Sequence, residues 1–240
     1  MFRKELSSEK MAAKLHPRRQ MAAAKKVTSL AASLIPEEPT LATLRQASKT
    51  CQACELWKSG TQTVFGEGSE LSRVMFVGEQ PGNDEDLAGK PFVGPAGRLL
   101  DKALEAAGID RDEAYVTNAV KHFKWEPRGK RRIHAKPNAA EIAACRPWLD
   151  AEINRVQPEA IVCLGATAAQ TLLGRQFRVT TRRGEFIPSP LAPIVMATVH
   201  PSAILRAPDD ESRHREMALF IEDLKKLGAA LKKKPQRRSA

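Results

Sequence analysis

The sequence predicts an α/β fold in which helices cover both faces of a central, mostly parallel four-stranded sheet, a three-layer α/β/α arrangement. Four short, continuously apolar runs are expected to be the strands, at residues 74–77, 114–117, 160–164 and 193–199. Helical patterns separate or follow them at 95–107, 138–154, 166–173 and 211–227. Strands without polar alternation need cover on both faces, and intervening helices give parallel connections.

The individual elements follow from local residue choice. Val74-Met75-Phe76-Val77 combines apolar and β-forming residues, as buried strands do. In the segment 95–107, Leu100, Ala103, Leu104 and Ala107 recur at helical spacing before Gly108, and glycine commonly ends a helix. The later segments repeat this alternation of strand and helix.

The length of 240 residues fits one domain with two basic extensions. We expect a flexible extension over 1–38, a domain over 39–228 and a tail over 229–240. The sequence has neither an apolar run long enough to cross a bilayer nor the pattern of a secretory signal. A monomeric, cytoplasmic protein associated with the nucleoid is therefore expected.

Charge is concentrated in a few segments. The net charge is +11, of which residues 1–50 carry +6 and residues 224–240 carry +7, so the body between them carries −2. Within that body, residues 121–136 contain seven Lys or Arg and one Glu. A basic cluster on an acidic body favours a polyanion such as nucleic acid, and Phe123 and Trp125 are candidates for stacking on bases. The alternative is a solvated loop with no ligand.

Polar residues follow the predicted strands. Glu79 comes just after the first strand, Asn118 after the second and His200 after the fourth. Ligands of parallel sheets bind at the carboxyl ends of the strands, so these side chains are expected to share one crevice. Each alone would be explained by a turn or a buried histidine. The sequence has no phosphate-binding GxxxxGK[ST] loop and no GxGxxG, which disfavours nucleoside triphosphate chemistry. It also has no Gly-x-Ser-x-Gly elbow, which disfavours a serine hydrolase.

Four cysteines form a second group: Cys51, Cys54, Cys145 and Cys163. In an intracellular protein they predict a tetrathiolate site, for either an iron–sulfur cluster or zinc, rather than disulfides. Cys163 alone would be read as a small buried apolar residue.

Several motifs together resemble the family 4 uracil-DNA glycosylases over about residues 48–225. They are Gly78-Glu79-Gln80-Pro81-Gly82, Pro91-Phe92-Val93-Gly94, Thr117-Asn118-Ala119-Val120-Lys121, His200-Pro201-Ser202 and the four cysteines. The segment Lys130-Arg131-Arg132-Ile133-His134 narrows the resemblance to the UdgX-type branch. This resemblance implies a [4Fe–4S] cluster on Cys51, Cys54, Cys145 and Cys163. It also implies uracil-containing DNA, single-stranded or double-stranded, as the partner.

The resemblance further implies that His134 bonds to the abasic sugar after uracil is cut out. The catalytic residues are then His134, Glu79, which orients His134, and His200, which stabilises the charge that develops on uracil O2. The expected substrate-binding residues are Gln80, Phe92, Asn118, Arg132, Gly78 and Ser202. Among them, Phe92 stacks on the flipped base and Asn118 reads its edge.

Two other functions remain open. A conventional multiple-turnover glycosylase would use His134 only as a DNA or supporting contact, and a non-catalytic iron–sulfur protein would bind uracil and thymine DNA alike.

Overall fold

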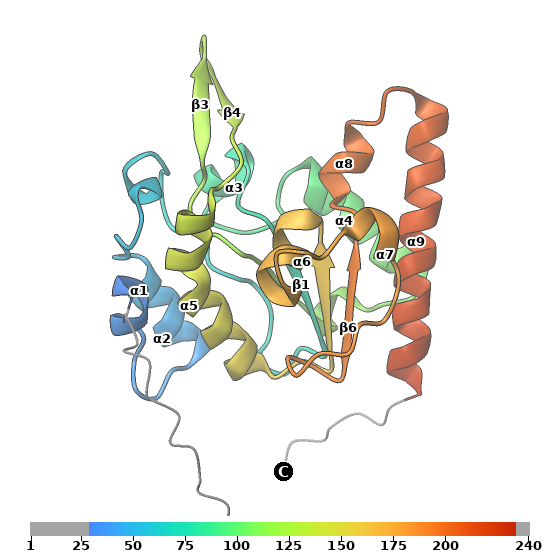
Figure 1. Cartoon of the computed structure of the whole chain (residues 1–240), viewed down its shortest axis with the longest axis horizontal. Coiled ribbons are helices and arrows are strands. Elements are labelled where there is room, and N and C mark those ends of the chain that lie inside the picture. The colour runs from blue at the N-terminus through green and yellow to red at the C-terminus, as the bar shows by residue number, and fades with distance from the viewer. Residues whose placement is uncertain (1–28, 234–240) are drawn as a thin grey trace, which may run out of the picture.

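A computed structural model describes residues 29–233 of the chain (Figure 1). Most of the expected N-terminal extension, residues 1–28, and residues 234–240 of the expected C-terminal tail lie outside the described residues. Residues 29–38, expected to be part of the extension, include a short helix, α1 (Leu30–Ser33). Ala31 of this helix is fully buried, and α1 contacts α5 (Ala139–Val156).

The central sheet has four strands in the order β2–β1–β5–β6, and every neighbouring pair is parallel. The strands are β1 (Val74–Gly78), β2 (Ala114–Asn118), β5 (Ala160–Leu164) and β6 (Ile194–Thr198). All the residues of these strands are buried. The continuous apolar runs therefore predicted the strands and their parallel arrangement correctly.

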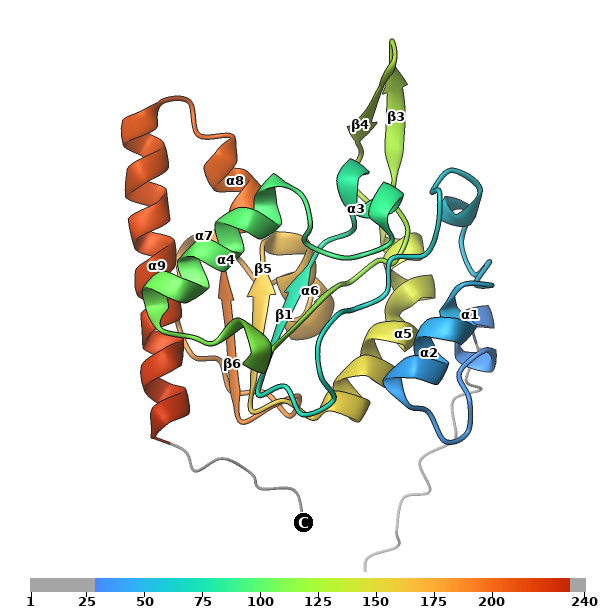
Figure 2. The ribbon, with the colours of Figure 1, turned by 180° about the vertical axis from the view of Figure 1, so that it is seen from behind.

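Helices cover both faces of the sheet, as Figures 1 and 2 show from opposite sides. On one face, Met75 and Ile161 belong to the same core as Trp148 of α5 and Ala168 of α6 (Ala166–Leu173). On the other face, Phe76 packs in a core with residues of α4 (Pro95–Ala107) and α9 (Asp210–Lys232). The predicted three-layer fold is confirmed.

The predicted helices match the observed ones closely. The helices α4 and α6 have the predicted bounds, and α4 ends at Gly108 in the left-handed conformation that glycine adopts easily (φ 66°). The helix predicted over 138–154 is α5, which starts one residue later and ends at Val156, and the last helix extends to Lys232. The remaining short helices are α2 (Leu41–Ser48), η1 (Glu55–Lys58), α3 (Asn83–Ala88), η2 (Arg111–Glu113), α7 (Val179–Arg182) and α8 (Pro201–Leu205).

The basic segment is a β-hairpin rather than a loop. Its strands β3 (Trp125–Arg128) and β4 (Arg131–His134) pair antiparallel. Gly129, at φ 58°, begins the two-residue connection, and such short turns need left-handed backbone. The hairpin projects from the end of the sheet where α3 and α8 also lie (Figure 1).

None of the helices in the described part of the chain is long and apolar enough to cross a membrane.

Candidate active site

The carboxyl ends of the strands carry the predicted polar residues to one edge of the sheet. Gly78 at the end of β1 pairs in register with Asn118 at the end of β2. Beyond the strands, the backbone N–H groups of Ala119 and Val120 donate to the carbonyl oxygens of Gly78 and Glu79 over 2.9 and 3.0 Å. These bonds hold Glu79 and Asn118 at the same edge, as the parallel sheet predicts.

Gly78 lies at the point where three predicted side chains meet. A Cβ atom at this position would lie 2.3 Å from Oδ1 of Asn118, 2.9 Å from Cζ of Phe92 and 3.4 Å from Nε2 of His200. The first two distances are too short for a Cβ atom, so any side chain at this position would displace Asn118 or Phe92. The structure thus brings Asn118, Phe92 and His200 around one small space.

Phe92 is held against His200. Its ring centroid lies 6.0 Å from that of His200 with an interplanar angle of 28°. The backbone of Phe92 is left-handed, at φ 57°, which is unusual for a bulky residue and costs free energy. A Cβ on Gly97 would overlap the Phe92 carbonyl oxygen, so the helix α4 packs directly beneath this strained residue.

The His200 ring is fixed in one tautomer. Nδ1 accepts a hydrogen bond from the backbone N–H of Ser202 over 3.1 Å and lies 2.8 Å from the Ser202 hydroxyl. Because a backbone N–H can only donate, Nδ1 carries no proton and Nε2 carries it. Burial, together with the nearby Arg206 and His134, lowers the pKa of His200 to about 4. His200 is therefore a neutral donor whose Nε2–H faces the space beside Gly78. Ser202, predicted to bind substrate, contacts His200 in this structure.

Glu79 contacts the predicted nucleophile. Its Oε1 lies 3.4 Å from Nε2 of His134, at the end of β4. Its other oxygen, Oε2, accepts a hydrogen bond from the hydroxyl of Thr167 in α6. The His134 side chain is about half exposed, and its ring centroid lies 6.2 Å from that of Phe123. The hairpin thus brings a histidine to a carboxylate 55 residues away in the chain.

Gln80 fixes the base of the hairpin. Its amide nitrogen donates to the carbonyl oxygens of Lys124 and Ala135, over 3.1 and 3.0 Å, and its oxygen accepts from the Lys124 N–H over 3.0 Å. These bonds join both strands at the point where they leave the domain. The side chain that was predicted to bind the uracil edge is thus occupied with the hairpin in this structure.

Arg132 anchors the hairpin to the domain through hydrogen bonds to three residues. Its Nη1 donates to Oδ2 of Asp86 over 2.6 Å and to the Thr61 hydroxyl over 3.1 Å, and its Nε donates to Oδ1 of Asn83 over 2.9 Å. Asp86 is fully buried in α3 and also accepts from the N–H and hydroxyl of Thr61. Arg132, predicted to bind substrate, braces the hairpin in this structure.

The two aromatic residues considered for base stacking lie under Arg132. The guanidinium carbon lies 5.4 Å from the ring centroid of Phe123 and 5.6 Å from that of Trp125. Phe123 is buried, and the indole N–H of Trp125 donates to the Ser59 carbonyl oxygen. The expectation that Phe123 stacks on DNA bases is wrong, because its ring belongs to the support of the hairpin.

Three of the four cysteines gather near α5. Burial, with smaller contributions from the nearby Cys54 and Cys51, raises the pKa of the Cys145 thiol to about 12. The backbone N–H of Lys121 donates to Sγ of Cys145, and the indole N–H of Trp148 donates to Sγ of Cys51, each over 3.2 Å. N–H donors to sulfur are typical around thiolates that bind metal clusters.

The fourth cysteine, Cys163, belongs to the central sheet rather than to α5 or the segment around residue 50. It lies in β5, and burial alone raises the pKa of its thiol to about 12. Among the described residues, no three His, Cys, Asp or Glu side chains converge on a single point as ligands of one metal ion would. Both the expected role of Cys163 as a cluster ligand and its interpretation as a small buried apolar residue stay predictions.

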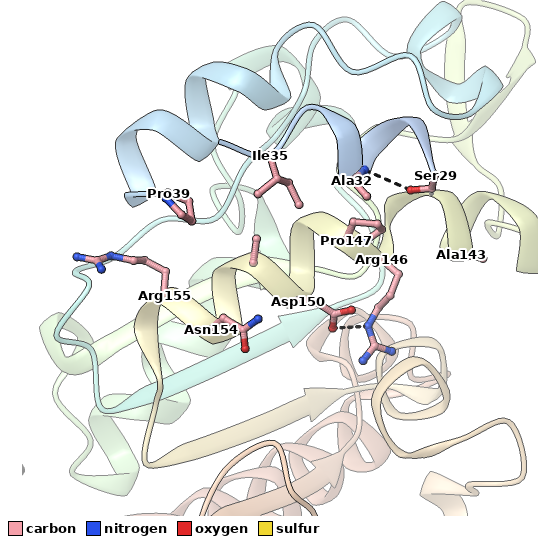
Figure 3. Close-up of a pocket in the computed structure, with 11 residues that line it drawn as sticks. Ser29, Ala32, Ile35, Pro39, Ala143, Arg146, Pro147, Asp150, Asn154 and Arg155 are labelled. Atoms are coloured by element: carbon pink, nitrogen blue, oxygen red, sulfur yellow. Dashed lines mark hydrogen bonds and ion pairs between the residues drawn. The ribbon is translucent and has the colours of Figure 1, made fainter. Parts of the chain in front are cut away.

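A separate groove of about 830 Å³ lies between α1 and α5. Figure 3 shows Ala32 and Ile35 on one wall and Pro147 on the other, with the Arg146–Asp150 ion pair at the edge. None of the predicted site residues lines this groove.

Two residues of this edge were missed or misread in the sequence. Thr167 follows the third predicted strand, so the same strand-end reasoning that found Glu79 could have found it. Asp86 was missed as a support of the hairpin, because a single carboxylate in a Gly/Pro/Asn-rich segment gives no sign that a distant arginine will pair with it.

Comparisons with known proteins agree with this geometry. The family model of the uracil DNA glycosylase superfamily matches residues 65–225. The chain is 39% identical to the type-4 uracil-DNA glycosylase of Thermotoga maritima over 77% of this chain and 91% of that protein. It is 35% identical to the type-4 enzyme of Archaeoglobus fulgidus, over 77% and 90% of the two chains. It is also 30% identical to the type-5 uracil-DNA glycosylase of Pyrobaculum aerophilum, over 69% and 77%. The chain belongs to the uracil DNA glycosylase superfamily.

Proposed function

We propose that this protein excises uracil from DNA and then stays covalently bonded to the abasic sugar through His134. The observation that supports the covalent bond is the distance of 3.4 Å between Oε1 of Glu79 and Nε2 of His134, beside the space around Gly78. The first half is supported by the type-4 relatives, which are named as uracil-DNA glycosylases.

The space beside Gly78 would take the flipped base. Asn118 offers both a donor and an acceptor, so it can pair with O4 and N3–H of uracil, whereas cytosine presents the reverse pattern at that edge. Phe92 offers an aromatic face next to the base. A base has to leave the stack to reach such a pocket, and the exposed Arg128, Lys130 and Arg131 of the hairpin would contact the phosphates.

The proposed chemistry has two bond changes. The C1′–N1 bond breaks and its electron pair leaves with uracil, whose O2 receives a hydrogen bond from Nε2–H of His200. A lone pair of the neutral His134 ring then forms a C–N bond to the electron-poor C1′. The ring becomes positively charged, and the carboxylate of Glu79 stabilises that charge and can accept the ring proton. Capture succeeds if His134 reaches C1′ before water does.

We also propose that Cys51, Cys54 and Cys145 supply thiolates to a [4Fe–4S] cluster. Their mutual proximity and the N–H donors to two of the sulfur atoms support this proposal. The cluster would join the segment around residue 50 to α5, and no step of the reaction at C1′ is assigned to it.

The decisive experiment is to mix the protein with a labelled uracil oligonucleotide, heat the mixture in SDS and run a denaturing gel beside a thymine control. A uracil-dependent, heat-stable shifted band is expected. Abasic DNA in excess of enzyme, without a band, would instead identify a conventional turnover enzyme, and intact uracil DNA would identify mere binding.

The variant His134→Ser tests the nucleophile. The shifted band should disappear, and uracil release should continue past one equivalent because water regains access to C1′. A heat-stable band of undiminished yield in this variant would remove His134 from the role.

A further inference from the structure

The two oxygens of the Glu79 carboxylate have different partners. Oε1 faces His134 of the hairpin at 3.4 Å, and Oε2 accepts the hydroxyl hydrogen of Thr167. Thr167 lies 88 residues from Glu79 in the chain and belongs to α6. The carboxylate is therefore held between an element that projects from the domain and a helix that packs on the sheet.

The hydroxyl of Thr167 has to be the donor in this contact. An ionised carboxylate can only accept, whereas a hydroxyl can donate. Thr167 is buried, at 4% exposure, so water does not compete easily for the bond. A hydrogen bond to a charged group in such surroundings is stronger than one between neutral groups.

The donor is also fixed in position. Thr167 is the second residue of α6, which begins after Gly165, and the Gly165 N–H donates to the Thr198 carbonyl oxygen at the end of β6 over 2.9 Å. The β-branched side chain of threonine has few rotamers. The first turn of a helix additionally favours a nearby negative charge.

We propose that Thr167 is a positioning residue for covalent capture, because it fixes Oε2 of Glu79 and so keeps Oε1 directed at His134. Without this bond the carboxylate is free to rotate, and His134 loses a fixed partner for the positive charge that its ring acquires. Capture by His134 then slows relative to capture by water, whereas breakage of the glycosidic bond, served by His200 and Asn118, does not depend on Thr167. This inference rests on the proposed function.

The test compares Thr167→Val, which keeps the shape and loses the hydroxyl, with Thr167→Ser, which keeps the hydroxyl. The matched control is Thr171→Val, one turn further along α6, where the hydroxyl donates to the Thr167 carbonyl oxygen over 2.7 Å. With enzyme in excess over uracil DNA, two quantities are measured: the rate of uracil release, and the fraction of released sites that become heat-stable adduct.

We expect Thr167→Val to lower the ratio of adduct to free abasic product about tenfold, as befits the loss of one charge-assisted hydrogen bond. The rate of uracil release should stay within about twofold of the wild type, and Thr167→Ser and Thr171→Val should keep the wild-type ratio. Thr167→Ala provides a second variant without the hydroxyl, and thermal unfolding of each protein shows that it is folded.

An unchanged ratio in both Thr167→Val and Thr167→Ala would overturn the inference while leaving covalent capture intact. A low ratio in Thr167→Ser equal to that of Thr167→Val would also overturn it, since packing rather than the hydroxyl would then matter. If the wild type releases uracil and forms no adduct, the proposed capture itself fails, and Thr167 has no such role.

Discussion

The proposed role of His200 depends on which ring nitrogen carries its proton and does not need a positive charge on the ring. With Nδ1 occupied by the Ser202 N–H and a pKa lowered to about 4, the ring is neutral at neutral pH and its one proton is on Nε2. The neutral ring can donate its Nε2–H directly to the departing uracil and stabilise the negative charge that develops there. The ring centroid of His200 lies 6.0 Å from that of Phe92. This packing fixes the plane of the His200 ring relative to the space beside Gly78.

Replacing His200 with Ala should slow single-turnover uracil release about 100-fold, the usual cost of removing one preorganised donor from a site of developing negative charge. Adduct formation should slow in parallel, because it follows base departure. Quenched time courses of free uracil measure the effect. Ser202→Ala is the control, since it keeps the backbone N–H that fixes the tautomer and should slow release far less. Wild-type release rates in His200→Ala would rule out the electrostatic role.

The hairpin is the element on which the proposed covalent capture would depend. Side chains tie it to the domain at its base and along both strands. Gln80 bonds the backbone at Lys124 and Ala135, the Trp125 indole donates to the Ser59 carbonyl oxygen, and Arg132 pairs with Asp86 of α3. Its tip is exposed. A two-stranded hairpin alone is marginally stable in water, so these contacts, rather than strand pairing, hold His134 beside Glu79.

The variant Asp86→Asn should therefore loosen the hairpin. Asp86 accepts three hydrogen bonds, two of them on Oδ2, and an amide nitrogen in place of that oxygen would face two donors. Removing one partner of a buried ion pair costs about 3 kcal/mol of unfolding free energy. Adduct yield should fall at least tenfold, with a smaller change in uracil release, which the gel assay and free-uracil assay measure together.

Asn83→Ala serves as the matched control for that variant. Its side chain accepts from Nε of the same Arg132, but at an exposed position, so its loss should cost less than about 1 kcal/mol. Equal effects of the two substitutions, in urea unfolding and in adduct yield, would mean that the buried ion pair does not hold the hairpin.

The sequence predicted the elements whose signal is local and missed those that depend on distant partners. The strand 160–164 and the helix 95–107 each contain their own evidence, in a continuous apolar run and in residues at helical spacing ended by Gly108. The hairpin sequence contains no such local evidence, because its strands are mostly exposed and charged, and only Gly129 marks the turn. The convergence of Glu79, Asn118 and His200 was predictable because parallel strands end at one edge, and the same reasoning extends to Thr167. The contact of Asp86 with Arg132 was not, because nothing in the sequence around Asp86 indicates its distant partner.

At the scale of the whole molecule, a buried network connects the base pocket to the cysteines. The ammonium group of Lys121, 1% exposed, donates to Glu152 of α5, to the Thr117 hydroxyl and to the Asn118 carbonyl oxygen. The backbone N–H of the same lysine donates to Cys145. Lys121 thus contacts the backbone of Asn118, which is proposed to read uracil, and the sulfur of Cys145. Its partners Glu152 and Cys145 both belong to α5, so this helix contributes to both regions.

The proposed cluster leads to a prediction about which cysteines would hold its iron. Cys51 lies close enough to raise the pKa of the Cys54 thiol, and both lie close enough to raise that of Cys145, whereas burial is what raises the pKa of Cys163 in β5. We expect Cys145→Ala to lose bound iron and the visible absorbance of an iron–sulfur cluster, and to unfold at a lower temperature, because thiolate ligation contributes to folding. Cys163→Ala is the matched control: it should keep its iron and lose only the stability that follows from a small cavity, about 1 kcal/mol. Iron analysis and visible spectra of anaerobically purified proteins measure both. Loss of iron from Cys163→Ala, with Cys145→Ala retaining it, would mean that the cluster is ligated from the strand rather than from the helix.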